Sequence, residues 1–226
     1  MQSSILEIGA GTGWQARLLS ERGFRVEAID IKIPPKRGLF WSVKTYDGKH
    51  IPFGDSSFDV VFSSNVLEHI PRAEIFQDEI TRVLKPHGTA IHVLPTPTWR
   101  LWTLLSHYPY VLKLLFASLR SDEAVLSRSD QEKSSIVTAL CKALWPPAHG
   151  VQGNALSEIY WFKEQRWGAL FERTGWRIKR SWPSGLFYTG GAIFGGLMSV
   201  DSRKKLGRYL GSSTMIFVLE KECPFA

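Results

Sequence analysis

The chain has 226 residues, of which 44% are hydrophobic and 22% are charged. This is the composition of an ordinary folded protein, and it excludes the disordered, collagen-like and repeat classes. Two cysteines, Cys141 and Cys223, are too few for a disulfide framework or a four-ligand zinc site, and no secretory signal pattern is visible. We therefore expect a cytoplasmic protein in a reducing compartment.

The formal net charge of +7 lies entirely in the second part of the chain. Residues 1–94 contain 11 basic and 11 acidic residues, whereas residues 95–226 contain 17 basic and 10 acidic residues. Seven of the nine tryptophans lie between Trp99 and Trp182. This contrast indicates a neutral core followed by a basic, aromatic region that faces an anionic or amphiphilic partner.

Strand-like and helix-like segments alternate along the first 94 residues. Residues 4–8 predict a strand, residues 14–22 a helix and residues 24–29 a second strand, which together form a β-α-β unit with parallel strands. The segments that continue this alternation are a strand at 58–63, a helix at 72–84, a turn at 85–88 and a strand at 89–94. Such alternation is typical of a sheet covered by helices on both faces.

The periodicity is lost after Pro95 and Pro97, and residues 96–153 are predicted to form an inserted lid or acceptor-binding segment. Within it, residues 101–119 are nearly all apolar, are interrupted by Pro109, and are framed by Arg100 and Arg120. This pattern fits a packed helical lid or an interfacial helix better than a membrane span. The segments predicted to close the domain are a helix at 157–174 and strands at 175–182 and 214–220.

A glycine loop, Gly9-Ala-Gly-Thr-Gly13, follows the first strand directly. Glycines in such a turn let the backbone approach a ligand closely and present N–H groups at the start of a helix. The dinucleotide fingerprint requires glycine or alanine where this chain has Trp14, so a nicotinamide-dependent oxidoreductase is the alternative rather than the first choice. Glu7 can receive a ligand amine, and Asp30, at the end of the second strand, can accept two ribose hydroxyls.

The motif Glu7-Ile-Gly-Ala-Gly-Thr-Gly13, with an acid closing the second strand, resembles the first motif of the class I S-adenosylmethionine-dependent methyltransferases. Residues 46–48, 57–61, 63–70 and 83–88 are similar to later segments of small-molecule methyltransferases of the quinone-biosynthesis type. The resemblance is close over residues 4–94 and covers residues 157–220 only as a general layout. It implies one methyltransferase domain over residues 1–226, with a Rossmann-like seven-stranded sheet, mostly parallel with an antiparallel last strand.

The resemblance also implies S-adenosylmethionine as the cofactor and a small-molecule or lipophilic methyl acceptor. The residues that it assigns to the cofactor are Glu7, Gly9, Ala10 and Gly11 for the methionine end, Asp30 for the ribose, Ile31, Asp47 and Gly48 for the adenine, and Ser64 or Asn65 for backbone contacts to the methionine carboxylate or amine. Members of this family usually carry a helix before the first strand. A shortened N-terminus is therefore one interpretation of this chain.

Methyl transfer is an in-line displacement, which requires alignment and, for a hydroxyl acceptor, a base. No metal is needed in principle, and none is predicted. His149, in the segment that returns to the core, and His69, after the fourth strand, are the candidate catalytic residues. His92, His107 and Tyr160 are further candidates.

Two further expectations concern partners. The chain lacks the Asn- or Asp-Pro-Pro-aromatic tetrapeptide often carried by nucleobase methyltransferases, so no nucleic-acid partner is expected. The segment 99–120 is predicted to cover the acceptor pocket, with peripheral membrane contact as the second interpretation. A non-catalytic S-adenosylmethionine-binding module is the remaining alternative, although an intact motif favours an enzyme.

Overall fold

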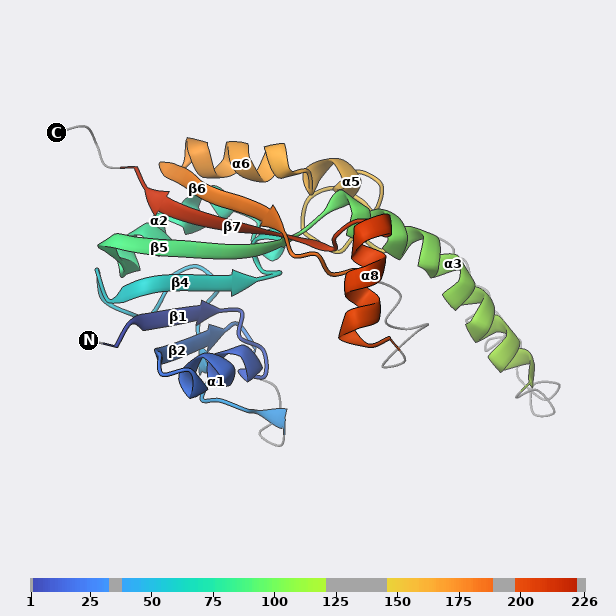
Figure 1. Cartoon of the computed structure of the whole chain (residues 1–226), viewed down its shortest axis with the longest axis horizontal. Coiled ribbons are helices and arrows are strands. Elements are labelled where there is room, and N and C mark those ends of the chain that lie inside the picture. The colour runs from blue at the N-terminus through green and yellow to red at the C-terminus, as the bar shows by residue number, and fades with distance from the viewer. Residues whose placement is uncertain (1, 33–37, 121–145, 189–197, 223–226) are drawn as a thin grey trace.

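The computed structural model describes residues 2–32, 38–120, 146–188 and 198–222, with side chains omitted for 113–120. Seven strands form one sheet in the order β3-β2-β1-β4-β5-β7-β6 (Figure 1). The strands are β1 (Ser4–Ile8), β2 (Arg25–Asp30), β3 (Lys44–Thr45), β4 (Phe58–Ser64), β5 (Leu84–Pro95), β6 (Trp176–Pro183) and β7 (Thr214–Lys221). Neighbouring strands are parallel except that β7 is antiparallel to both β5 and β6. The predicted fold class is thereby confirmed.

Helices lie on both faces of this sheet. They are α1 (Trp14–Glu21), the 3-10 helix η2 (Leu67–His69), α2 (Ala73–Val83), α3 (Pro97–Arg120), α5 (Glu158–Trp161), α6 (Glu164–Arg173) and α8 (Val200–Leu210). In Figure 1, α3 extends away from the sheet, beyond α8 and α5. Among the described residues, no helix combines the length and hydrophobicity that crossing a membrane requires.

The two faces of the sheet have separate apolar cores because successive side chains of a strand point in opposite directions. On β1, Ile5 belongs to the cluster that includes Ala16 of α1. The next residue, Leu6, belongs to the larger cluster that includes Phe76 of α2 and Phe171 of α6. This alternation fixes the register of β1, since a shift of one residue would exchange its two faces.

The register also aligns the carboxyl ends of the first, second and fourth strands. Ile8 pairs with Ile29 of β2 and with Ser63 of β4. Loops that leave the carboxyl ends of parallel strands therefore meet at one edge of the sheet, which is where ligands bind in open α/β sheets. We call it the cofactor edge.

Three local predictions differ from the structure. Residues 85–88, predicted as a turn, lie within β5. They form an irregularity in its pairing with β4, between the pairs Phe58–Leu84 and Val60–Thr89. Helix α8 was not predicted, although Ser199 caps it by accepting a hydrogen bond from the Ser202 N–H. Pro109 does not interrupt α3, which is one helix. Of the predicted lid, residues 121–145 lie outside the described residues.

Candidate active site

The glycine loop adopts a backbone that glycine allows and most other residues do not. Gly9, Gly11 and Gly13 have φ values of 72°, 54° and 74°. A Cβ on Gly9 would clash with Val66, whereas one on Gly11 would meet no atom within 4 Å. The loop is therefore packed tightly against the 64–67 segment at Gly9 and is open to a ligand at Gly11.

Glu7 is the last but one residue of β1, and its side chain is buried beneath this loop. Its Oε2 atom has no hydrogen-bond partner among the described residues. Burial raises the pKa of Glu7 to about 7, with a smaller contribution from the charge of Asp30, while a hydrogen bond from the Ala16 N–H acts in the opposite direction. Glu7 thus offers an unused acceptor whose charge changes near neutral pH.

Asp30 ends β2, as predicted, and its carboxylate faces the glycine loop. Oδ2 accepts a hydrogen bond of 2.7 Å from the Gly11 N–H, and Oδ1 accepts one of 3.1 Å from the Lys32 N–H. Each oxygen keeps further lone-pair capacity for a ligand hydroxyl. Ala10 contributes only backbone groups here, and its N–H donates to Ile29.

The predicted adenine-side residues also lie together. Ile31 is 65% exposed, and a Cβ on Gly48 would lie 3.1 Å from its Cγ2 atom. Asp47 accepts hydrogen bonds from the N–H groups of Lys49 and His50, and its Oδ2 lies 3.0 Å from the His50 Nδ1. These contacts hold the pKa of Asp47 well below its usual range.

Ser64 and Asn65 stand at the end of β4. Asn65 has a φ of 53°, in the left-handed region, and its N–H donates a 2.8 Å bond to the Val93 carbonyl. That donor is consequently used within the sheet. Any backbone contact of Asn65 to a ligand amine must come from its carbonyl oxygen.

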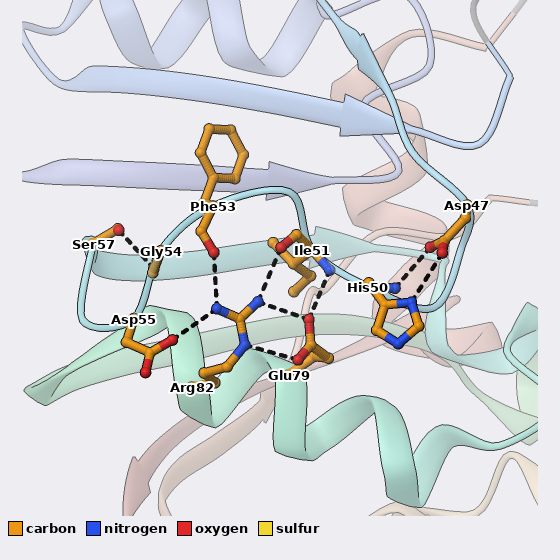
Figure 2. Close-up of polar contacts among 9 residues, drawn as sticks. All are labelled: Asp47, His50, Ile51, Phe53, Gly54, Asp55, Ser57, Glu79 and Arg82. Atoms are coloured by element: carbon orange, nitrogen blue, oxygen red, sulfur yellow. Dashed lines mark hydrogen bonds and ion pairs between the residues drawn. The ribbon is translucent and has the colours of Figure 1, made fainter.

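A network around Arg82, which the sequence analysis missed, fastens the loop after Asp47 to α2 (Figure 2). The guanidinium binds both carboxylate oxygens of Glu79 at 2.8 Å. It also donates to the carbonyls of Ile51 and Phe53 and to Asp55. Glu79 in turn accepts the Ile51 N–H at 2.7 Å. The adenine-side loop is therefore held by a planar, multidentate anchor.

The two candidate catalytic histidines, 80 residues apart in sequence, lie against each other. The imidazoles of His69 and His149 have centroids 4.7 Å apart, and Trp99 packs edge-on against His149 at 4.6 Å. Their side chains are 44% and 34% exposed, so both are accessible. Because η2 follows β4, this pair stands next to the cofactor edge.

The loop that carries His149 is fixed by a buried ion pair. Arg100 and Glu158 have side chains 3% and 1% exposed, and their Nε and Oε2 atoms are 2.9 Å apart. Glu158 Oε1 accepts the N–H groups of His149 and Gly150, while Arg100 donates to the Ala155 and Pro147 carbonyls. Arg100, which the sequence places at the start of the apolar stretch 101–119, is thus buried in this pair.

The other candidate bases have different environments. His92 is fully buried in β5, bonds Ser63 through Nδ1 at 2.7 Å and stacks on Phe171. Burial lowers its pKa to about 3, so it is a neutral core residue that cannot reach an acceptor. Tyr160 lies beneath the Arg166 guanidinium at 4.1 Å, and His107 contacts Tyr108 on α3.

Comparison with known proteins gives the sequence relatives of this chain. Residues 6–92 match a family model described as a methyltransferase domain. The chain is 32% identical over 123 residues to a bifunctional biotin biosynthesis protein of Cellvibrio japonicus, covering 49% of this chain and 24% of that protein. It is 32% identical over 100 residues to the 2-methyl-6-phytyl-1,4-hydroquinone methyltransferase of Synechocystis, covering 39% and 31%. The chain thus spans about a quarter to a third of these relatives.

Solved structures match over nearly the whole chain. A Mesorhizobium loti S-adenosylmethionine-dependent methyltransferase is 14% identical with a TM-score of 0.55, covering 97% of this chain and 91% of that one. Over residues 6–92 the chain is thus similar to methyltransferase domains, and its fold is that of S-adenosylmethionine-dependent methyltransferases. Burkholderia thailandensis 1,6-didemethyltoxoflavin-N1-methyltransferase, solved with its substrate and S-adenosylhomocysteine, is 15% identical with a TM-score of 0.55, covering 98% and 72%.

S-adenosylmethionine, the cofactor of these methyltransferases, fits the residues of this chain. The open space at Gly11 admits a ligand next to the backbone, and the unpartnered oxygen of Glu7 is a suitable acceptor for a cationic amine. Asp30 offers a charged acceptor at the end of the neighbouring strand. We expect these three residues to bind the methionine and ribose parts of the cofactor.

The affinity of this protein for S-adenosylmethionine is expected to rise between about pH 6 and pH 8, because a cationic ligand favours the ionised form of Glu7. Folding stability should change in the opposite sense. The pKa of Glu7 is raised in the folded state, so its contribution is complete below its ordinary value near 4.5 and is lost as the pH rises through about 7. Calorimetric titrations across this range, with Glu7→Gln as the comparison, would measure both effects. If the affinity of the Glu7→Gln variant for S-adenosylmethionine changed with pH as that of the wild type does, the role of Glu7 would be contradicted.

The Asp30→Ala variant is expected to bind S-adenosylmethionine more weakly by about 1.5 to 3 kcal/mol, which is the range for hydrogen bonds to a charged group. Asp30→Asn, which retains an acceptor for the Gly11 N–H, should separate ligand binding from support of the loop. Asp201→Ala, on the exposed first turn of α8, is the matched control. Unchanged affinity in both Asp30 variants would refute the ribose assignment.

Proposed function

We propose that this chain transfers the methyl group of S-adenosylmethionine to a small-molecule or lipophilic acceptor. The observation that carries the proposal is the accessible pair His69–His149 beside the cofactor edge. When bound, the cofactor supplies an activated methyl group. In our proposal the two imidazoles contact the acceptor, and His149 or His69 takes its proton.

A cavity near this pair has the size of a small-molecule site. It has a volume of about 640 Å³, lies between the start of α2 and helices α5 and α6, and is lined in part by Glu68, Gly150, Trp161 and Arg166. Cavities of this size hold ligands of metabolite size. The indole of Trp161 and the guanidinium of Arg166 favour an aromatic or amphiphilic acceptor. The hydroquinone methyltransferase among the relatives supports an acceptor of the quinol type.

Transfer of label from radioactive S-adenosylmethionine tests this proposal. The protein would be incubated with a cell extract, and the label would then be traced to small molecules, lipid, protein and nucleic acid. We expect it in the small-molecule or lipid fraction, and we expect His149→Ala to lower the transfer while cofactor binding is retained. Label found mainly in nucleic acid would overturn the acceptor class.

Calorimetry separates this function from the two alternatives. Binding of NAD without binding of S-adenosylmethionine would favour an oxidoreductase. Binding of S-adenosylmethionine with no transfer to any fraction would favour a non-catalytic module. The motif favours neither outcome, since Trp14 occupies the position where a dinucleotide site needs glycine or alanine, and the loop glycines and Asp30 are intact.

The first part of the predicted lid, helix α3, supports a further proposal, namely that its exposed side covers the acceptor or reaches a membrane surface. Four apolar side chains on one side of α3 are exposed, at positions spaced three or four residues apart: Leu101, Leu105, Tyr108 and Leu112. Such spacing makes a continuous stripe on a helix. We propose that this stripe contacts the lipophilic acceptor, with a membrane surface as the second candidate.

Vesicle co-sedimentation distinguishes the two candidates for the stripe. Leu105→Ser with Leu112→Ser should lower methyl transfer if the stripe covers the acceptor, without changing sedimentation. If the stripe contacts a membrane instead, the wild-type protein should sediment with anionic vesicles at low salt and to a smaller extent at high salt. The double variant should then not sediment with the vesicles. Unchanged transfer and unchanged sedimentation would refute both.

A further inference from the structure

Glu68 is a buried carboxylate without a hydrogen-bonding partner. It lies in η2, its side chain is fully shielded from solvent, and neither Oε1 nor Oε2 has a hydrogen-bond partner among the described residues. An unpaired buried charge is expensive, and proteins normally compensate it with a cation or a metal ion. Arg100, a buried cation on the neighbouring helix α3, is already paired with Glu158.

Two imidazole nitrogens lie just beyond hydrogen-bond distance of this carboxylate. The Nε2 atoms of His149 and His69 are 3.7 Å and 3.9 Å from Glu68 Oε1. One ligand atom from each of the three residues can be chosen so that all lie within 4.8 Å of one another. Ligands of a tetrahedral zinc ion, at about 2.0 to 2.1 Å from the metal, lie roughly 3.3 Å apart. Small rotations of the exposed imidazoles would bring these ligand atoms to the separation that a tetrahedral ion requires.

Two anchors hold the backbone of both halves of this cluster, and neither uses the side chains of the three proposed ligands. The Val151 N–H donates a 3.0 Å hydrogen bond to the Glu68 carbonyl, which attaches the His149 loop to η2. Glu158 holds the same loop through the N–H groups of His149 and Gly150. The cluster is therefore preorganised by two anchors, as a binding site for an ion requires.

We propose that Glu68, His69 and His149 bind one divalent transition-metal ion of the class that includes Zn²⁺ and Co²⁺. Two imidazoles and one carboxylate are a donor set that suits these ions, and the half-exposed histidines leave coordination positions open. The sequence predicted no metal, because His149 lies 80 residues from the adjacent pair Glu68 and His69 and the three form no spacing motif.

The consequence for catalysis rests on the proposed function. With the ion bound, the metal would replace the imidazoles as the group that activates the acceptor, so His69 and His149 act as bases only in the metal-free protein. An acceptor hydroxyl that coordinates the ion would lose its proton more readily, since a metal lowers the pKa of a bound oxygen. The metal site itself is independent of that step, and it can be measured without cofactor or acceptor.

A titration with Co²⁺ tests the site. The visible absorption of Co²⁺ should show that each chain binds one ion and that the ion has a low coordination number. Added Zn²⁺ should displace the Co²⁺. We expect His69→Ala and His149→Ala to weaken Co²⁺ binding at least tenfold. Glu68→Gln should do the same. His87→Ala is the matched control, because this exposed histidine lies near the start of β5, at the end of the sheet opposite the cofactor edge, and it should bind Co²⁺ as the wild type does.

The two histidine variants decide the test, because their side chains are half exposed and their loss should leave the fold intact. S-adenosylmethionine binding by the same variants checks that they are folded. Absence of Co²⁺ binding in the wild type, or equal binding in the wild type and the histidine variants, would overturn the proposal. A bound ion with no methyl transfer to any acceptor would leave the metal site in place and contradict only the proposed function.

Discussion

The Glu158→Ala variant is expected to lose about 3 to 5 kcal/mol of unfolding free energy, which is the range for breaking a buried ion pair from one side. The change leaves the Arg100 guanidinium buried without its counter-charge, and burial already lowers the pKa of that group. It also removes the acceptor of the His149 and Gly150 N–H groups. Urea denaturation followed by circular dichroism would measure the loss.

Two comparisons isolate the cause of this loss. Glu220→Ala removes an exposed carboxylate that pairs with Arg177 and Lys179, and such surface pairs contribute at most about 1 kcal/mol. The double variant Arg100→Met with Glu158→Gln removes both charges and keeps an acceptor for the loop, so it should be more stable than Glu158→Ala. A loss below about 1 kcal/mol in Glu158→Ala would show that the pair is not essential to the fold.

The Arg82→Ala variant is expected to lower the unfolding free energy by about 2 to 3 kcal/mol, since it removes several hydrogen bonds that involve a charged group. The Glu79 carboxylate and the carbonyls of Ile51 and Phe53 all lose their partner. Glu79 retains only the Ile51 N–H. Denaturation would measure the stability, and calorimetry would measure S-adenosylmethionine binding, which should weaken because the Asp47 loop loses its anchor.

Arg82→Lys is the informative companion variant. A lysine keeps the charge but cannot reproduce the planar, bidentate contact with Glu79, so it should recover only part of the stability. Arg173→Ala, which breaks an exposed 3.6 Å ion pair with Glu74, is the control and should have little effect. If Arg82→Lys matched the wild type in both measurements, the geometry of the network would be irrelevant and the charge alone would suffice.

The cofactor edge could be predicted from the sequence because its residues lie in local motifs. Glu7, the glycine loop and Asp30 belong to one β-α-β unit, and parallel pairing then brings the strand ends together without further information. The structure places each of them at that edge. The closing strands were also predicted, at 175–182 after the glycine that ends the preceding helix and at 214–220, and β6 and β7 lie there.

The acceptor side could not be predicted in the same way, because its contacts join distant parts of the chain. Arg100 was predicted only to flank the apolar stretch 101–119, and the fold shows that Glu158 neutralises it in the interior. His69 and His149 were separate candidates, and no sequence spacing indicated that they share Glu68. Arg82 belongs to an ordinary amphipathic helix in the sequence, so its anchoring role depends on where the 47–57 loop folds back.

Strand β7 determines when this sheet can be completed during synthesis. It lies between β5 and β6. Its residue Leu219 pairs with Ala90 of β5 on one side and with Ile178 of β6 on the other. Until residues 214–221 have left the ribosome, β5 and β6 each present an open edge with unpaired N–H and C=O groups. A nascent chain therefore passes through an aggregation-prone state until residues 214–221 can pair. Premature termination before residue 214 would make that state permanent, so truncated chains should depend on chaperones.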